Sequence, residues 1–317
     1  MMRRREFILG VGGAVAAGPL AARSQPAIPV VGFRAVTAPS RLSLAWTQTS
    51  APSEFNEGYA TGDGARLYFV RSGEGPLMLF LHGHPDSHSL YEAQLKEFNR
   101  DHLVVAPNLR GYPPSDAPDS VEAYAMPRLL GDPHGLLDHL GRERCILVAN
   151  DWGGYVGWVF ASAYPGRVDG LIILNAPHPA IFLREVRTNP AQIRASQYER
   201  AFHTAAPPYP RWYNYYRADP IKVPSSIAEG APVGIPDLSA HFFAGVVRPP
   251  AVTSLRVPTL VIWGLSDPTL LSGLLDGLEE QVHDLTLVRI NEAGHYPMRS
   301  HPGLVNQAIR DFVRRLR

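Results

Sequence analysis

Short apolar runs alternate with longer amphipathic segments along most of the chain from residue 55 onward. The continuous apolar runs are typical of strands buried on both faces of a parallel sheet. They lie at residues 77–81, 103–107, 145–148, 170–174, 259–263 and 285–290. The segments between them predict helices at about residues 89–99, 126–140, 155–163 and 270–278, and from residue 304 onward. This alternation predicts an α/β fold with a mostly parallel sheet and helices on both faces.

Two parts of the pattern differ from this scheme. Residues 65–70 alternate between apolar and polar, which predicts an edge strand. From about residue 180 to 250 the alternation stops, and the segment is rich in Pro, Tyr and Arg. An irregular and helical insertion between two strands predicts a lid over the carboxyl ends of the strands, where open α/β sheets bind ligands. We therefore expect a core of residues 54–179 and 251–317 and a lid of residues 180–250.

The first 53 residues are expected to lie outside this fold. Three arginines at positions 3–5 precede a weakly apolar, Gly-rich stretch and then small residues near position 23. This arrangement resembles a twin-arginine export signal over residues 1–24, followed by a linker over 25–53. The apolar stretch is too short to anchor stably in a bilayer. The protein is therefore expected to be periplasmic or secreted if the leader functions, and cytoplasmic otherwise.

Composition narrows the choice of partners. The chain has 317 residues, of which 45% are hydrophobic and 19% charged, and its formal net charge is +1. This balance is typical of a globular protein and gives no reason to expect a nucleic-acid or membrane partner. The single cysteine, Cys145, opens an apolar strand and is expected to be buried. No Cys and His residues occur at metal-ligand spacing, so no metal or cofactor is expected.

Asp151 stands where an apolar strand turns into a helix. Residues 149–154 read small-x-Asp-x-small-small, the pattern of a nucleophile elbow. Such a turn strains the central residue and needs small neighbours, and it pushes the central side chain above the sheet at a helix N-terminus. The alternative is that Asp151 merely caps the helix.

Two further residues support the elbow. Asp267 and His295 each follow a predicted strand, in the segments Gly-Leu-Ser-Asp-Pro and Glu-Ala-Gly-His-Tyr. Either residue alone is a common loop feature. A nucleophile, an acid and a histidine in this chain order match the order of the α/β-hydrolase triad.

Over residues 55–317 the chain resembles the α/β-hydrolase superfamily, and within it the epoxide hydrolases and the related haloalkane dehalogenases. The matching motifs lie at residues 82–85, 108–112, 150–154, 174–179, 263–267 and 293–295. The most specific combination is Asp-Trp-Gly-Gly at the elbow with Asn-Ala-Pro-His-Pro after the next strand. The sequence departs from the family pattern at Asn150, where relatives usually have a histidine.

The resemblance implies a two-step hydrolysis. A carboxylate suits displacement at a saturated carbon, so Asp151 is expected to form an ester with the substrate. His295, oriented by Asp267, is expected to activate the water that hydrolyses this ester. The backbone N–H groups of His84 and Trp152 are expected to stabilise the oxyanion.

The leaving group needs its own donors. In epoxide hydrolases two lid tyrosines protonate the alkoxide, and Tyr198 and Tyr216 lie in similar segments. Either tyrosine could instead only pack in the lid. His82, Pro85, Trp152 and His178 are expected to line the substrate pocket. The expected partners are a small-molecule epoxide and water, with a homodimer possible.

Four other functions are weighed against this one. A haloalkane dehalogenase could use the same triad, with Trp152 holding the halide, but His84 replaces the usual asparagine partner. A fluoroacetate-type dehalogenase would have an arginine directly after the nucleophile, where Trp152 stands, and a serine esterase would have a serine at the elbow. A protein that only binds a ligand stays open, because Tyr198 and Tyr216 are about 18 positions apart, and relatives have a longer lid between them. A shortened lid could leave the tyrosines badly placed.

Overall fold

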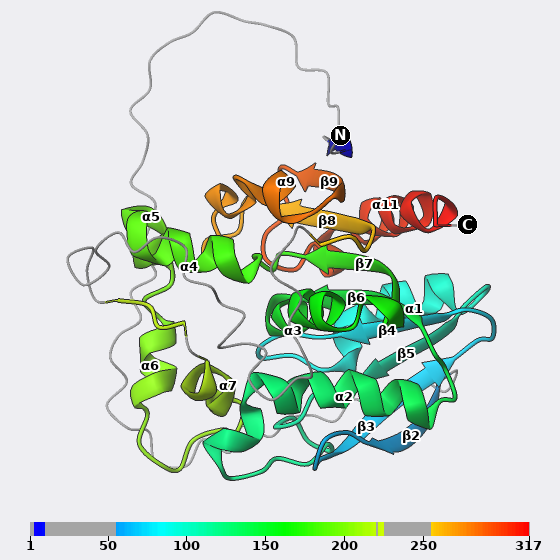
Figure 1. The fold of residues 1–317 in the computed structure, drawn as a ribbon, viewed down its shortest axis with the longest axis horizontal. Coiled ribbons are helices and arrows are strands. Elements are labelled where there is room, and N and C mark those ends of the chain that lie inside the picture. The colour runs from blue at the N-terminus through cyan, green and yellow to red at the C-terminus, as the bar shows by residue number, and fades with distance from the viewer. Residues whose placement is uncertain (1–2, 10–54, 220, 225–254, 317) are drawn as a thin grey trace, which may run out of the picture. The chain divides into compact units, whose positions relative to one another are not determined.

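The computed structural model describes residues 3–9, 55–219, 221–224 and 255–316. Its centre is a mostly parallel sheet with the strand order β1-β9-β8-β7-β6-β4-β5-β3-β2 (Figure 1). Only the pairs β2–β3 and β3–β5 are antiparallel. The strands are β1 (Arg3–Leu9), β2 (Asn56–Thr61), β3 (Arg66–Ser72), β4 (Leu77–Leu81), β5 (Leu103–Pro107), β6 (Cys145–Asn150), β7 (Val168–Leu174), β8 (Thr259–Gly264) and β9 (Asp284–Ile290). The predicted α/β architecture is confirmed.

One edge of the sheet differs from the prediction. The strand at residues 65–70 was expected at the edge, but β3 lies between β2 and β5, and β2 is the edge strand. The prediction is wrong because β2 has no recognisable apolar pattern. Of its six residues only Ala60 is buried, whereas β3 buries four residues in a row.

The other edge carries β1. This strand pairs in parallel with β9, from Arg3 opposite Asp284 to Leu9 opposite Ile290. The segment therefore joins the sheet, although the first 53 residues were expected to lie outside the fold. An open sheet edge presents unpaired N–H and C=O groups, which another strand can satisfy. The remainder of the expected leader and linker, residues 10–53, lies outside the described residues.

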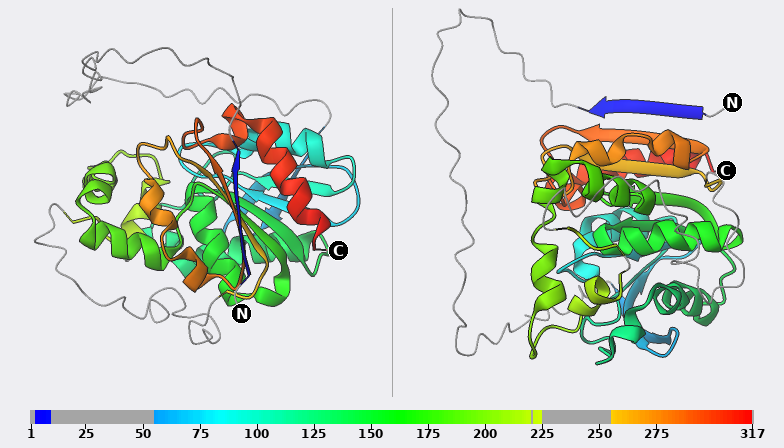
Figure 2. Two further views of the ribbon diagram at one scale, coloured as in Figure 1. Left: turned by 90° about the horizontal axis from the view of Figure 1, so that it is seen from above. Right: turned by 60° about the vertical axis from the view of Figure 1, so that its left-hand side comes forward.

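Helices cover the two faces of the sheet (Figure 2). Side chains alternate along β4, so that Leu79 joins the core under α2 (Met126–His139) and α3 (Asp151–Ala163). Phe80 joins the opposite core under α1 (Glu92–Phe98), α10 (Pro297–Ser300) and α11 (Pro302–Arg314). Among the described residues, no helix has the length and apolar character needed to cross a membrane.

The helix expected at residues 270–278 is not continuous. The structure has a 3-10 turn at Ser272–Leu275 and a short helix α9 (Leu278–Gln281) instead. Asp276 is extended and Gly277 has a φ of 82°, so the backbone leaves the helical region between the two pieces. A glycine at positive φ interrupts a right-handed helix at this point.

The lid is inserted between β7 and β8, as predicted. Its described part consists of α4 (Pro179–Thr188), α5 (Pro190–Ala195), α6 (Glu199–Thr204) and α7 (Tyr213–Ala218). Residues 225–250 of the predicted lid lie outside the described residues. Short loops join these helices, and the Asn189 side chain caps α5 by accepting a hydrogen bond of 2.9 Å from the Ala191 N–H.

Candidate active site

Asp151 is held in a strained turn between β6 and α3. Its φ is +50°, in the left-handed region that a non-glycine residue rarely adopts. Tight packing beneath the turn requires glycine, because a Cβ on Gly153 would lie 2.3 Å from the Leu81 carbonyl oxygen. The Asp151 carboxylate does not cap its own helix. It accepts a hydrogen bond of 2.7 Å from the His84 N–H instead.

The structure brings the three residues of the predicted triad together. His295 Nδ1 lies 2.7 Å from Asp267 Oδ2, and His295 Nε2 lies 3.5 Å from Asp151 Oδ2. Each residue follows the carboxyl end of a different strand, namely β6, β8 and β9. Because neighbouring parallel strands end at the same edge of the sheet, residues far apart in sequence meet above it.

Asp267 is fixed by a network that sequence reasoning did not identify. Its carboxylate accepts hydrogen bonds from Asn175 Nδ2 at 2.9 Å, from Thr269 N at 2.9 Å and from Leu270 N at 3.1 Å. Asn175 has a φ of +38°, and its side-chain oxygen accepts from the Gly264 N–H at 2.8 Å. Asn175 therefore joins the ends of β7 and β8 to the acid. The signal in the sequence was a polar residue directly after the buried run of β7.

Charge separates the roles of Asp151 and His295. Burial favours the neutral carboxyl of Asp151, but hydrogen bonding and charge from His295 and the His84 N–H outweigh it and lower the pKa of Asp151 to about 2. Burial likewise favours a neutral His295, but Asp151 and Asp267 raise the pKa of His295 to about 10. At neutral pH the resting site therefore holds an anionic Asp151 beside a cationic His295. When Asp151 loses its charge, only Asp267 still raises the pKa of His295, so that pKa falls.

The two lid tyrosines lie close to Asp151 despite the short lid. Tyr198 lines the same cavity as Asp151. Tyr216 is only 3% exposed, and its ring centroid lies 5.0 Å from that of Trp152 and 5.3 Å from that of His84. Burial, reinforced by the charge of Asp151, raises the pKa of the Tyr216 phenol well above the ordinary value. The pKa of Tyr198, whose side chain is 38% exposed, is raised in the same direction. Both therefore keep their protons at neutral pH.

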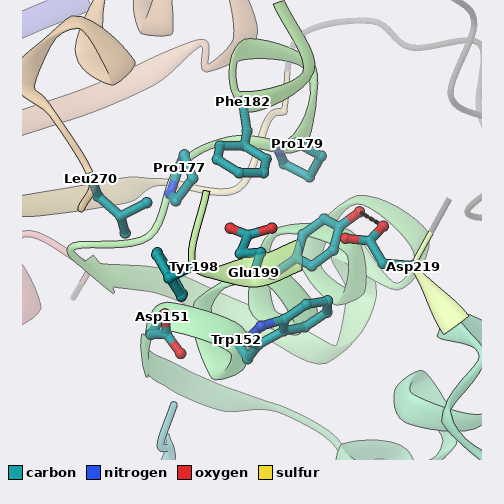
Figure 3. A pocket seen from close by; sticks show the side chains of 10 residues that line it. Asp151, Trp152, Pro177, Pro179, Phe182, Tyr198, Glu199, Asp219 and Leu270 are labelled. Carbon is teal, nitrogen blue, oxygen red and sulfur yellow. Dashed lines mark hydrogen bonds between the residues drawn. The ribbon is translucent and has the colours of Figure 1, made fainter. Parts of the chain in front are cut away.

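A cavity opens above the elbow (Figure 3) and encloses about 450 Å³ of empty space, including the part that meets solvent. Trp152 lines it, as predicted. Its walls are otherwise formed by the triad nucleophile and by residues of α3, the loop after β7, the lid and the loop after β8. The ten lining residues are Asp151, Trp152, Tyr155, Pro177, Pro179, Phe182, Tyr198, Glu199, Asp219 and Leu270.

Three residues predicted to line the pocket are not among these ten. His82 Nδ1 donates to the Gly83 carbonyl at 2.8 Å, and its Nε2 accepts from the Leu109 N–H at 3.0 Å. Burial lowers the pKa of His82 to about 4, so it is a neutral structural histidine. His178 caps α4 by accepting from the Ala180 N–H at 3.3 Å, while Pro85 is exposed.

The neighbours of His178 take its place in the wall. Pro177 and Pro179 line the cavity on either side of it in sequence, while the His178 ring packs against Trp158 at 5.2 Å. Sequence reasoning also missed Tyr155, Phe182, Glu199, Asp219 and Leu270. Without the fold, nothing in their local sequence marks them, because they come from three separate segments of the chain.

His84 presents its backbone N–H to the Asp151 carboxylate, and its donation to the oxyanion stays a prediction. Its imidazole is buried among Tyr112, Trp212 and Tyr216, and burial lowers its pKa to about 3. Neither ring nitrogen of His84 has a hydrogen-bond partner in the described part of the chain. The ring is therefore a neutral part of the aromatic wall. Donation by the Trp152 backbone N–H to the oxyanion stays a prediction, with Trp152 next to the nucleophile at the start of α3.

Metal binding has no support in the described residues, where no group of three or more His, Cys, Asp or Glu side chains could hold a metal ion. Cys145 is fully buried at the start of β6, as expected from the sequence.

Comparisons with known proteins match the fold. A family model described as alpha/beta hydrolase fold matches residues 76–208. Epoxide hydrolase 3 of Xenopus tropicalis is 31% identical over 90% of this chain and 84% of its own length. A solved structure from work on novel epoxide hydrolases in metagenomes from hot environments is 33% identical, covers 82% of this chain and 98% of its own, and has a TM-score of 0.71. A crystal structure of a variant of an epoxide hydrolase from Bacillus megaterium is 31% identical, covers 81% of this chain and all of its own, and has a TM-score of 0.66.

The charge arrangement predicts the effect of removing the orienting acid. In an Asp267→Asn variant the pKa of His295 falls below its wild-type value of about 10, because one of the two carboxylates that raise it is gone. An NMR titration of the imidazole resonances measures this. Asp63→Asn, at an exposed ion pair remote from the triad, is the control and leaves the value unchanged. A His295 pKa that is the same in both variants contradicts the assigned role of Asp267.

Proposed function

The chain belongs to the epoxide hydrolases of the α/β-hydrolase superfamily, and we propose that it opens an epoxide to a vicinal diol through an ester on Asp151. Four features of the site support this proposal: the strained elbow, the ionised carboxylate, the histidine–acid pair and the two protonated phenols. The observation that carries it is the position of the Asp151 carboxylate, held between His295 Nε2 at 3.5 Å and the His84 N–H at 2.7 Å.

In the first step an Asp151 oxygen attacks an epoxide carbon while the bond between that carbon and the epoxide oxygen breaks. The departing oxygen becomes an alkoxide and takes a proton from Tyr198 or Tyr216. A neutral phenol suits this task because it donates without bringing a charge into a buried cavity. The product is a hydroxyalkyl ester of Asp151.

In the second step water attacks the carbonyl carbon of that ester. Esterification has removed the negative charge of Asp151, so His295 keeps only Asp267 as an anionic partner and can lose its proton, which returns to the phenolate left by the first step. His295 Nε2 then accepts a proton from the attacking water. The oxyanion that forms on the former carboxylate receives the His84 N–H and, we propose, the Trp152 N–H. Collapse of this intermediate releases the diol with a proton and restores the Asp151 carboxylate beside the protonated His295 of the resting site.

The lid favours an epoxide over a halide as the leaving group. A dehalogenase needs N–H donors that face a halide, and the Trp152 indole is the available candidate. The Trp152 ring instead packs edge-on against Tyr216 in the lid, with ring centroids 5.0 Å apart. Two phenols near the nucleophile serve an alkoxide, which needs a proton, whereas a halide needs none.

Trapping the ester tests the nucleophile and the reaction together. A His295→Gln variant stalls after the first step, because no base activates water. Incubation with small epoxides then adds the mass of a whole epoxide to the protein, and intact-mass spectrometry detects this. An Asp151→Ala variant is the control and gains no mass. A gain equal to an alkyl group, from a haloalkane and not from epoxides, would assign dehalogenation instead, and no adduct on the folded variant contradicts both.

The phenols are tested by removing their hydroxyl groups. Tyr198→Phe and Tyr216→Phe each slow alkylation by about 10²-fold or more, because general acid catalysis contributes roughly that factor. Single-turnover kinetics measure the alkylation rate, while hydrolysis of the preformed ester stays within a few-fold of wild type. Tyr209→Phe, at a lid tyrosine that does not line the cavity, is the matched control. If neither variant slows alkylation, the proton comes from another group.

We also propose that residues 1–24 direct export of the folded protein through the twin-arginine route. The three arginines at positions 3–5 followed by an apolar stretch support this. In a bacterial host with that route, the protein is expected in the periplasm with an N-terminus near residue 25, by cell fractionation and mass spectrometry. Replacing the arginines with lysines should keep it in the cytoplasm. An intact N-terminus in the cytoplasm contradicts the proposal and leaves β1 as a permanent strand of the sheet.

The possible homodimer likewise stays a prediction, which light scattering of the purified protein settles.

A further inference from the structure

A buried carboxylate in the active-site cavity has no hydrogen-bond partner among the described residues. Glu199, the first residue of α6, is 7% exposed and lines the same cavity as Asp151. Figure 3 shows its carboxylate between Asp151 on one side and Asp219 on the other. Within the described part of the chain this carboxylate accepts no hydrogen bond. The proposed hydrolysis assigns it no role.

A second carboxylate belongs to the same end of the cavity. Asp219 follows α7, and its Oδ1 accepts from the Tyr155 hydroxyl at 3.2 Å and from the Ile221 N–H at 2.9 Å. No hydrogen bond to Oδ2 is found among the described residues. Asp219 is therefore held in place by one oxygen, and its other oxygen is available to a ligand.

The cavity lacks a positive charge to match these acids. Its ten described lining residues include three carboxylates and no lysine, arginine or histidine. The cation that acts on Glu199 and Asp219 is Lys222, whose Nζ donates to the Tyr216 and Arg217 carbonyls at 2.8 Å and 3.1 Å, away from the lining. Burial raises the pKa of Glu199 well above its ordinary value and that of Asp219 to about 7. Buried acids of this kind are ordinarily paired with a cation.

The walls indicate an organic cation. Among the described residues no three acidic or imidazole groups are placed to hold a metal ion. The rest of the lining is aromatic or apolar, with Trp152, Tyr155 and Phe182 beside two prolines. Aromatic faces attract alkylated ammonium groups, and apolar side chains accommodate their methyl groups.

We propose that Glu199 and Asp219 form a cation subsite that receives the ammonium group of an amine-bearing epoxide while Asp151 attacks the oxirane. This inference rests on the proposed function, because it assigns the class of epoxide that the same site accepts. The substrate then spans the cavity from the nucleophile to the lid, with its charge on the lid side. Binding the ammonium group favours the ionised form of both acids and releases their protons.

A matched pair of substrates tests the subsite. Glycidyltrimethylammonium and neopentyloxirane have the same shape and differ only in a quaternary nitrogen in place of a quaternary carbon. Wild-type enzyme is expected to have a kcat/KM at least ~10-fold higher for the ammonium compound, about the value of one favourable charge contact. The preference should grow as pH rises through about 7, where Asp219 loses its proton, since Asp151 is already ionised there and burial raises the pKa of Tyr155 and Glu199.

Variants assign the preference to the two acids. Glu199→Gln and Asp219→Asn should each reduce the ratio of the two kcat/KM values toward one. Glu74→Gln, at an exposed turn far from the cavity in sequence and in fold, should keep the wild-type ratio. A wild-type ratio near one, or a preference that survives both substitutions, overturns the subsite.

Failure of the proposed function gives a different result. If the folded wild-type protein turns over neither epoxide, the hydrolase proposal fails, and calorimetric binding of choline then tests the subsite alone. Choline binding that Glu199→Gln abolishes, without binding of the neutral carbon isostere of choline, supports the subsite. Equal behaviour of choline and its isostere overturns it. Thermal unfolding of each variant separates a lost contact from a lost fold.

Discussion

The charge balance between Asp151 and His295 is the interaction on which the rest of the site depends. A buried carboxylate ordinarily gains a proton, yet here a cationic imidazole and a backbone N–H keep it ionised. The same pairing keeps His295 protonated until Asp151 has reacted. One ion pair therefore sets the order of the two steps: the nucleophile is active first, and the base becomes active only once the ester has formed.

The fold supplies this arrangement through strain and close packing. Asp151 adopts a positive φ in a turn that leaves no room for a side chain at positions 83 and 153. Glycine at both positions therefore makes the strained turn possible. Asn175 and the turn after β8 hold Asp267 with several hydrogen bonds, so the imidazole has a fixed partner. The lid then completes the cavity above the sheet. Although it is short, its helices α6 and α7 still bring Tyr198 and Tyr216 close to the nucleophile.

The lid also explains why the cavity is acidic at one end. Glu199 directly follows Tyr198, and Asp219 lies three positions after Tyr216. The lid segments that hold the two tyrosines therefore also place a carboxylate each in the wall of the cavity. The chemistry at the oxirane needs the phenols and does not need these acids. A division between a reacting end and a charged end would let the lid select substrates without disturbing the triad.

The sequence predicted what depends on local pattern and chain order. Buried strands read as apolar runs, and Asp151, Asp267 and His295 each followed such a run, so their meeting could be inferred. The edge strand β2 has no such pattern, and the helix expected at residues 270–278 is interrupted at Gly277. The pocket wall could not be predicted, because it depends on which way side chains turn: His178 points back to cap its helix, while Pro177 and Pro179 face the cavity. Asn175 and Glu199 act only through neighbours distant in sequence.

The central claim is that an oxygen of Asp151 becomes part of the product. A single turnover with enzyme in excess over epoxide, in water enriched in oxygen-18, tests it most directly. The account predicts that the diol of this first turnover carries no label and that the label enters the peptide containing Asp151, because water attacks the ester carbonyl. Label in the diol from the first turnover, with none in that peptide, would show direct attack of water on the epoxide and contradict the covalent mechanism.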